Sequence, residues 1–206
     1  MNNVTRQIFL LSILTLVAVF IQCDCHDNEF QPITIIGHHG DALNEFDQPC
    51  GMFAALFPEP YEHVLLISDY GNNRIQCYVV ENTELNYAFG EFGSGPGQLN
   101  GPIDVAATKP FLYNEGVDPT NNPSIFVADS KNHRIQKFDI EGNFVFEWGS
   151  YGTDTSQFNV PVGIEIDMNA NVYVADSGNH RIQVFDSNGT FIKMWGNEGE
   201  IGRAHV

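Results

Sequence analysis

Basic residues are scarce in this chain. Nine Lys and Arg stand against 26 Asp and Glu, and the formal net charge of the 206 residues is −17. Arg6 lies near the N-terminus, and three arginines occupy one repeated position. The basic residues that remain are scattered singly: Lys109, Lys131, Lys137, Lys193 and Arg203. Because so acidic a surface repels phosphate backbones, we expect no nucleic acid partner.

Cysteine is also scarce, and the common catalytic motifs are absent from the sequence. Cys23 and Cys25 lie close to the N-terminus, which leaves Cys50 and Cys77 for the folded part of the chain. Two cysteines are too few for a disulfide framework. No Gly-x-Ser-x-Gly elbow, phosphate-binding loop or paired-cysteine metal motif occurs.

The chain has one long hydrophobic run, Ile8–Ile21, which follows Arg6. A cationic start before an apolar run of about 7–15 residues is typical of a secretory signal peptide, whereas a membrane span needs about 20. We predict a signal peptide over residues 1–25 and a secreted or lumenal location. An uncleaved signal anchor is the alternative and would be the only membrane association. Asn188, in the sequon Asn188-Gly189-Thr190, is a glycosylation candidate on a predicted turn.

The rest of the sequence indicates an all-β fold. Apolar residues make up 43% of the chain and aromatic residues 12%. They gather in short runs separated by Gly, Pro, Asn and Asp, as in a protein of many short strands.

A repeated segment is the strongest signal. SDYGNNRIQCY from Ser68, ADSKNHRIQKF from Ala128 and ADSGNHRIQVF from Ala175 align, as do FGEFGSGPGQLNGP from Phe89 and WGSYGTDTSQFNVP from Trp148. The third unit predicts four strands: Gly163–Met168, Val172–Ser177, Arg181–Asp186 and Phe191–Gly196. Four short antiparallel strands in each unit of about 40–45 residues are typical of a β-propeller blade.

The pattern VYVADSGNHRIQVFDSNG, followed by an aromatic-Gly pair, Gln-Phe and Pro-x-Gly, resembles the NHL repeat. The resemblance covers about residues 33–199 and implies a β-propeller, commonly of six blades. It implies no single function, because the family includes protein-binding and RNA-binding modules and has lyases and esterases as distant relatives.

We therefore predict about three blades and one extra N-terminal strand, Ile33–Gly37, within residues 33–199. Residues 26–32 form a short N-terminal segment, and residues 200–206 form an irregular tail. Six blades would need about 130 more residues, so we expect further blades downstream; the alternative is that two copies close one ring. Open blade edges favour self-association.

The repeated charges have a predicted scaffold role. The pairs recur once in each blade: Asp69 with Arg74, Asp129 with Arg134, and Asp176 with Arg181. We expect the carboxylate to accept backbone N–H groups of the Asn-bearing loop, and the arginine to bridge to it or to a neighbouring blade. In the same register Cys50 lies on the first strand and Cys77 on the third. These strands are about 9–10 Å apart, so the two thiols should not be linked.

Unit two carries an extended loop, about residues 109–123, with three apolar residues that are candidates for ligand binding: Phe111, Leu112 and Tyr113. Long loops on a rigid scaffold often carry binding sites. The alternative is a surface insertion whose aromatic rings pack back on the blade.

No metal-binding residues are predicted, although calcium or zinc in the central channel stays an alternative. His38 and His39 are adjacent and point to opposite faces of a strand. Asp104 lies near the start of an innermost strand, where an acid could bind calcium. The leading hypothesis is a non-enzymatic module that binds a protein or peptide, without a cofactor. The alternative is a propeller enzyme resembling the peptidyl-amidating lyases or lactonase-like hydrolases.

Overall fold

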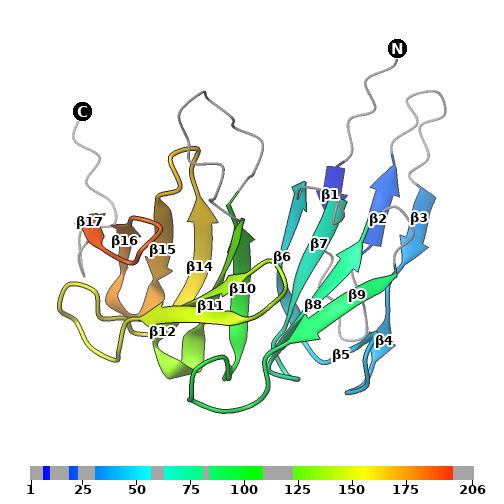
Figure 1. The fold of residues 1–206 in the computed structure, drawn as a ribbon, viewed down its shortest axis with the longest axis horizontal. Helices are drawn as coiled ribbons and strands as arrows, with labels where there is room; N and C mark the ends of the chain where they lie inside the picture. The colour runs from blue at the N-terminus through cyan, green and yellow to red at the C-terminus, as the bar shows by residue number, and fades with distance from the viewer. Residues whose placement is uncertain are drawn as a thin grey trace.

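The computed structural model describes residues 7–9, 19–22, 31–56, 63–80, 84–108 and 123–196. Three four-stranded antiparallel sheets follow one another along the chain (Figure 1). Blade one contains β6 (Pro49–Leu56), β7 (His63–Asp69), β8 (Arg74–Val79) and β9 (Leu85–Phe89). Blade two contains β10 (Pro102–Ala107), β11 (Ser124–Asp129), β12 (Arg134–Asp139) and β13 (Phe144–Trp148). Blade three contains β14 (Pro161–Ile166), β15 (Val172–Asp176), β16 (Arg181–Phe185) and β17 (Phe191–Trp195).

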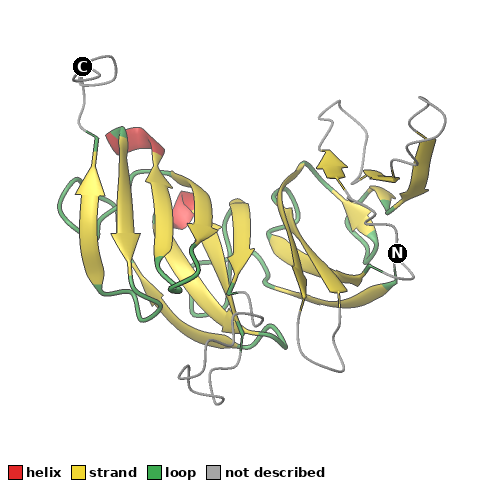
Figure 2. Cartoon of the chain, turned by 90° about the horizontal axis from the view of Figure 1, so that it is seen from above, coloured by secondary structure: helices red, strands yellow, loops and turns green. Residues whose placement is uncertain are grey.

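The predicted blade architecture is confirmed. In each blade the four strands are paired in chain order, and the strands of unit three begin and end within two residues of their predicted bounds. Two 3-10 turns, η1 (Ser130–Asn132) and η2 (Ser177–Asn179), connect the second and third strands of blades two and three. The first strand β10 contacts both β6 and β14, so the first strands of the three blades are neighbours. Figure 2 shows the sheets side by side.

The N-terminal part differs from the single extra strand that the sequence predicts. Strand β3 (Gln31–Ile35) belongs to a three-stranded antiparallel sheet with β1 (Gln7–Phe9) and β2 (Val19–Gln22). Two short parallel strands, β4 (His38–His39) and β5 (Glu45–Phe46), come next. Strands β1 and β2 fall within residues 1–25, whose role as a signal peptide stays a prediction. The described residues include no helix of the length and apolar character needed to cross a membrane.

The second strands of blades one and two show how the blades pack against one another. Five consecutive apolar or small residues of β7 are fully or almost fully buried, and β11 is similar, because these strands lie between two other sheets. Outer strands such as β13 instead alternate between half-buried and exposed residues. The strand patterns therefore follow from stacking a sheet between two neighbours.

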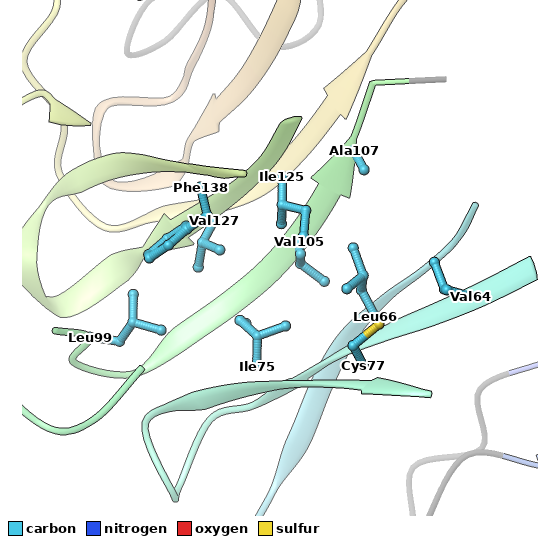
Figure 3. Close-up of a cluster of buried hydrophobic side chains, with 10 residues drawn as sticks. All are labelled: Val64, Leu66, Ile75, Cys77, Leu99, Val105, Ala107, Ile125, Val127 and Phe138. Atoms are coloured by element: carbon cyan, nitrogen blue, oxygen red, sulfur yellow. The ribbon is translucent and has the colours of Figure 1, made fainter. Parts of the chain in front are cut away.

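An apolar cluster fills the space between blades one and two (Figure 3). Its buried members come from both blades and the connection between them: Val64, Leu66, Ile75, Cys77, Leu99, Val105, Ala107, Ile125, Val127 and Phe138. Burying a side chain of this size contributes about 1.5–3 kcal/mol, so this interface supplies much of the driving force for stacking. A second cluster joins blades two and three in the same way.

Candidate functional site: the repeat scaffold and an exposed aromatic face

Each repeated aspartate is a buried acceptor at the end of a second strand. The side chains of Asp69, Asp129 and Asp176 have no exposed surface. The Nε of the arginine five residues later lies 2.8 Å from Asp69 Oδ2, 2.8 Å from Asp129 Oδ2 and 2.7 Å from Asp176 Oδ2. The same oxygen accepts the side-chain amide of the loop asparagine, as Asn132 Nδ2 at 2.9 Å shows in blade two.

The backbone partner of each aspartate differs from the expected one. In blade two, Asp129 Oδ1 accepts the backbone N–H of Asn100 at 2.7 Å. Asn100 belongs to the crossover, the connection from the last strand of one blade to the first strand of the next. The expected partner was a backbone N–H of the Asn-bearing loop, but that loop supplies a side-chain amide instead. The carboxylate therefore ties the crossover to the blade that follows it.

The arginine side chains complete this connection. Arg134 donates to the carbonyls of Ser94, Gly95 and Gln98 at 2.8–3.0 Å and forms an ion pair with Glu147. Arg74 and Arg181 bind three carbonyls each in their own crossovers. In each case the carbonyls belong to the crossover that leads into the blade of that arginine. Because four hydrogen bonds of each arginine run to its own carboxylate and crossover, this constellation is suited to holding a loop in place.

A buried glutamine belongs to the same scaffold, and the sequence reasoning assigned it no role. Gln136 Nε2 donates to the Gln98 carbonyl at 2.6 Å and to Asp129 Oδ2 at 3.1 Å. Gln76 and Gln183 make the corresponding contacts. The signal was present in the sequence, because Arg-Ile-Gln recurs in all three units.

Aromatic side chains are exposed on the crossovers, at the end of the blades where the second and third strands are joined. Phe92 is 70% exposed and Tyr151 is 68% exposed, and both precede a glycine at the same repeat position. The Tyr151 ring lies 4.9 Å from that of His133. Lys131 Nζ lies 4.5 Å from the centre of the Tyr70 ring. We call these five residues the crossover face.

The sequence does not single out the crossover face, because Phe92 and Tyr151 lie in glycine-rich segments that are typical of connecting loops. Aligning FGEFG from Phe89 with WGSYG from Trp148 would have revealed the recurring aromatic position. A large apolar side chain that is held exposed at a repeated position is available for contact with another molecule.

Asp104 occupies the innermost strand of blade two. Its Oδ2 accepts the N–H of Ile164 at 3.0 Å, and its Oδ1 accepts the N–H of Val105 at 3.0 Å. Burial raises the pKa of the Asp104 carboxyl, and the two backbone hydrogen bonds oppose that rise. Burial, and secondarily the charge of Asp104, raises the pKa of the Cys50 thiol. Cys50 and Cys77 are both free thiols, as predicted.

The remaining predicted site residues are distributed as follows. Phe111, Leu112 and Tyr113 lie outside the described residues. Asn188 is exposed on the turn between β16 and β17. Among the described residues, no three His, Cys, Asp or Glu side chains are grouped closely enough to hold a metal ion. His38 contacts Glu45 at 2.9 Å, and His39 lies 3.8 Å from Asp47.

Known proteins share the repeat and the fold. The NHL repeat family matches residues 158–185. The chain is 44% identical over 73 residues to Protein brain tumor of Drosophila melanogaster. This alignment covers 35% of this chain and 6% of that protein. It is 37% identical over 93 residues to human NHL repeat-containing protein 2, covering 44% of this chain and 12% of that protein. The chain thus spans a small part of these relatives.

Solved structures show the same fold at low identity. A chain of the BBS1N complex with ARL6DN gives a TM-score of 0.55 at 12% identity, covering 87% of this chain and 47% of that one. A chain of the nidogen/laminin complex gives 0.52 at 15% identity, covering 84% and 54%. The repeat, the four-stranded sheets and these likenesses agree: the chain contains an NHL repeat at residues 158–185, and its repeated units fold as β-propeller blades.

Proposed function

We propose that this chain is a non-enzymatic module that binds a protein or peptide through its crossover face, in the secretory pathway or outside the cell. NHL-repeat proteins are generally protein-interaction modules, which supplies the general class. The observation that carries the proposal is the pair of exposed rings, Phe92 and Tyr151, at one repeat position of a rigid scaffold.

The geometry of the crossovers supports this function. The backbone around each ring is fixed by the following blade, because Asn132 Nδ2 donates to the Gly93 carbonyl and Asn179 Nδ2 to the Gly152 carbonyl, both at 2.8 Å. Rings on a rigid backbone lose little conformational entropy on binding. Lys131, next to Tyr70, adds a positive charge that suits an acidic residue of the ligand.

Charge and composition favour a protein ligand over nucleic acid. The formal net charge of −17 opposes phosphate backbones, and the repeated arginines are committed to Asp and backbone carbonyls. The alternative is a propeller enzyme with a metal in the central channel, where Asp104 is the candidate acid of this chain. Each oxygen of Asp104 already accepts a backbone N–H, which leaves its carboxylate less available for chemistry.

A peptide-display selection on the purified chain tests the proposal. Peptides that bind wild-type protein should lose at least tenfold in affinity to Phe92→Ala and to Tyr151→Ala, because a buried aromatic contact is worth about 1.4 kcal/mol or more. Met168→Ala is the matched control, since Met168 is 72% exposed and lies on the β14–β15 turn, away from the crossovers. Selected peptides that bind all three variants equally would contradict the assigned face.

A further inference from the structure

One side-chain position, just before each repeated arginine, supplies a hydrogen-bond acceptor between adjacent blades. Asn73 Oδ1 accepts the backbone N–H of Gly101 at 2.8 Å, where blade one meets blade two. His133 Nδ1 accepts the N–H of Val160 at 3.1 Å, where blade two meets blade three. Both donors directly precede the proline that begins the next first strand. The acceptor is thus an amide in one place and an imidazole in the other, and only the imidazole is protonated between about pH 5 and 8.

Val160 holds an unfavourable backbone conformation. Its φ is +56°, in the left-handed region, where the Cβ of an L-residue crowds the backbone and β-branched residues are rare. Gly101, at the same repeat position, adopts a φ of +59° without this cost because glycine has no Cβ. Val160 is held from both sides, since His133 accepts its N–H and its carbonyl accepts the Ser177 hydroxyl at 2.7 Å. Strain of this kind persists only where surrounding contacts enforce it, so loss of one contact should let the backbone relax.

The same histidine contacts the crossover face. The rings of His133 and Tyr151 lie 4.9 Å apart, with their planes at 64°. Tyr151 is exposed and lies in the crossover that ends at Val160. One imidazole therefore fixes the backbone at the end of this crossover and also packs against the exposed ring that the crossover carries. We call these three residues the His133 cluster.

Protonation would reverse the role of the His133 ring. A neutral imidazole that accepts at Nδ1 carries its proton on Nε2, whereas both nitrogens of an imidazolium are donors. The imidazolium would direct one N–H at another, that of Val160, and the hydrogen bond between them would be lost. The amide of Asn73 does not titrate, so the hydrogen bond between blades one and two is unaffected by such a change in pH.

Other ionisable groups surround His133, so its own titration has to be separated from theirs. They lie beside it on η1 and β12, on the crossover that faces it, and on β13 and β10: Lys131, Arg134, Tyr151, Asp154, Glu147 and Asp104. The Arg134 guanidinium stays charged at every pH considered and forms ion pairs with Asp129 and Glu147. A substitution of His133 itself isolates its contribution from that of all these groups.

We propose that His133 is a proton-sensitive positioning residue of the crossover face. At neutral pH its ring holds Val160 in the strained conformation and keeps Tyr151 in place for a ligand. On protonation the Val160 N–H loses its acceptor, the end of the crossover relaxes, and ligands that contact Tyr151 bind more weakly. The inference rests on the proposed function and adds regulation by pH to it.

Hydrogen exchange of the full chain, without a ligand, tests the cluster directly. The protection factor of the Val160 amide, followed by NMR, should fall about tenfold from pH 7.5 to pH 5.5 in wild type, as for the loss of one hydrogen bond. It should stay constant in His133→Asn, because asparagine supplies the acceptor as Asn73 does. The Gly101 amide is the internal reference and should be constant in both proteins. Equal protection of the wild-type Val160 amide at both pH values would overturn the proposal.

Peptide affinity tests the consequence for binding. The probe is a display-selected peptide that requires Tyr151 and has blocked termini and no ionisable side chain, so that only the protein titrates. Its affinity for wild type should fall about threefold or more from pH 7.5 to pH 5.5. The ratio between the two pH values should be close to one for His133→Asn. Val160→Gly should also remove the dependence, because glycine adopts the positive φ without strain.

A histidine in blade three supplies the matched control. His180 occupies the same repeat position and is exposed, and its ring has no hydrogen-bond partner among the described residues. His180→Asn should therefore retain the wild-type loss of affinity at pH 5.5. A peptide that requires Phe92 alone should bind equally at both pH values, because Asn73 holds the end of that crossover.

The two measurements keep this proposal separate from the proposed function. If no peptide requires Tyr151, peptide binding at this face fails, while the exchange of the Val160 amide still decides the role of His133. An affinity that falls equally in wild type and His133→Asn on acidification would refute regulation by His133. A Val160→Gly variant that responds to pH as wild type does would refute the role of the strained backbone.

Discussion

Asp104 Oδ2 accepts the backbone N–H of Ile164 at 3.0 Å, so one carboxylate joins the first strands of blades two and three. The other oxygen accepts the N–H of Val105 in its own strand. Gly51 and Gly163 occupy the corresponding positions of the flanking first strands. An acidic residue between two glycines thus forms a bridge where the blades approach most closely.

The Asp104 bridge predicts a pH dependence. Burial raises the pKa of this carboxyl in the folded chain above its unfolded value, so the folded state favours the protonated form. The contribution of Asp104 to the free energy of unfolding should therefore fall as the pH rises above about 4, until the folded-state pKa is passed. Urea unfolding of wild type and Asp104→Asn at pH 4–8 measures this contribution. A difference that grows in favour of wild type with rising pH would contradict it.

Gly51→Ala should be costly and Gly163→Ala mild. A Cβ on Gly51 would lie 2.2 Å from Asp104 Oδ1 and 2.7 Å from the Ile103 carbonyl, whereas a Cβ on Gly163 would first meet Ala175 Cβ at 3.4 Å. Overpacking of this kind costs about 1–3 kcal/mol, while the Gly163 variant should stay within about 0.5 kcal/mol of wild type. Thermal unfolding of both variants provides the comparison, and equal losses would refute the steric argument.

Asp129→Ala should destabilise the chain by about 1–3 kcal/mol, because it removes the fully buried acceptor of the Asn100 N–H and of Arg134 Nε, while Glu147 still pairs with the guanidinium. Asp154→Ala is the control, since Asp154 is an exposed aspartate of a crossover and should change stability by less than about 0.5 kcal/mol. Chemical unfolding gives both values. A small effect of Asp129→Ala would show that the repeated ion pair does not hold the blade together.

The two thiols should differ in reactivity. Burial raises the pKa of the Cys77 thiol to about 11, so iodoacetamide should leave it unmodified in the native protein. Cys50 is exposed, and Asp104→Asn should accelerate its alkylation at pH 8, because the variant removes a charge that raises the pKa of this thiol. Asp139→Asn, remote from Cys50, is the control. Peptide mass spectrometry gives both rates, and a Cys50–Cys77 linkage in native protein would contradict the strand register.

Asn188 should carry an N-linked glycan after secretory expression. The side chain is exposed, and its turn is held by the N–H groups of Asn188 and Thr190, which donate to Asp186 Oδ1 at 2.9 and 2.8 Å. Treatment with an N-glycosidase should lower the mass of wild type and leave Asn188→Gln unchanged. Secreted wild-type protein without a glycan would contradict this prediction.

The blades could be predicted from the sequence because the same strand and turn residues recur in each unit. Strands that recur with the same turn residues cannot be read in another register without exposing their apolar face, and β14–β17 lie close to their predicted bounds. The carbonyl partners of Arg134 and the bridge from Asp104 to Ile164 were not predictable, because they depend on how neighbouring sheets are placed. The exposure of Phe92 and Tyr151 likewise depends on what covers each crossover.

The closed set of contacts around each repeated arginine has a consequence for how such a chain can change in length. Each of these arginines binds the crossover that leads into its own blade, as Arg74, Arg134 and Arg181 all show. The hydrogen bonds of one repeat therefore depend little on the neighbouring repeat. Duplicating or deleting a whole repeat therefore carries its internal hydrogen bonds along intact. Only the apolar faces and a few hydrogen bonds between adjacent blades must then fit the new neighbour. This favours growth of the gene by complete repeats.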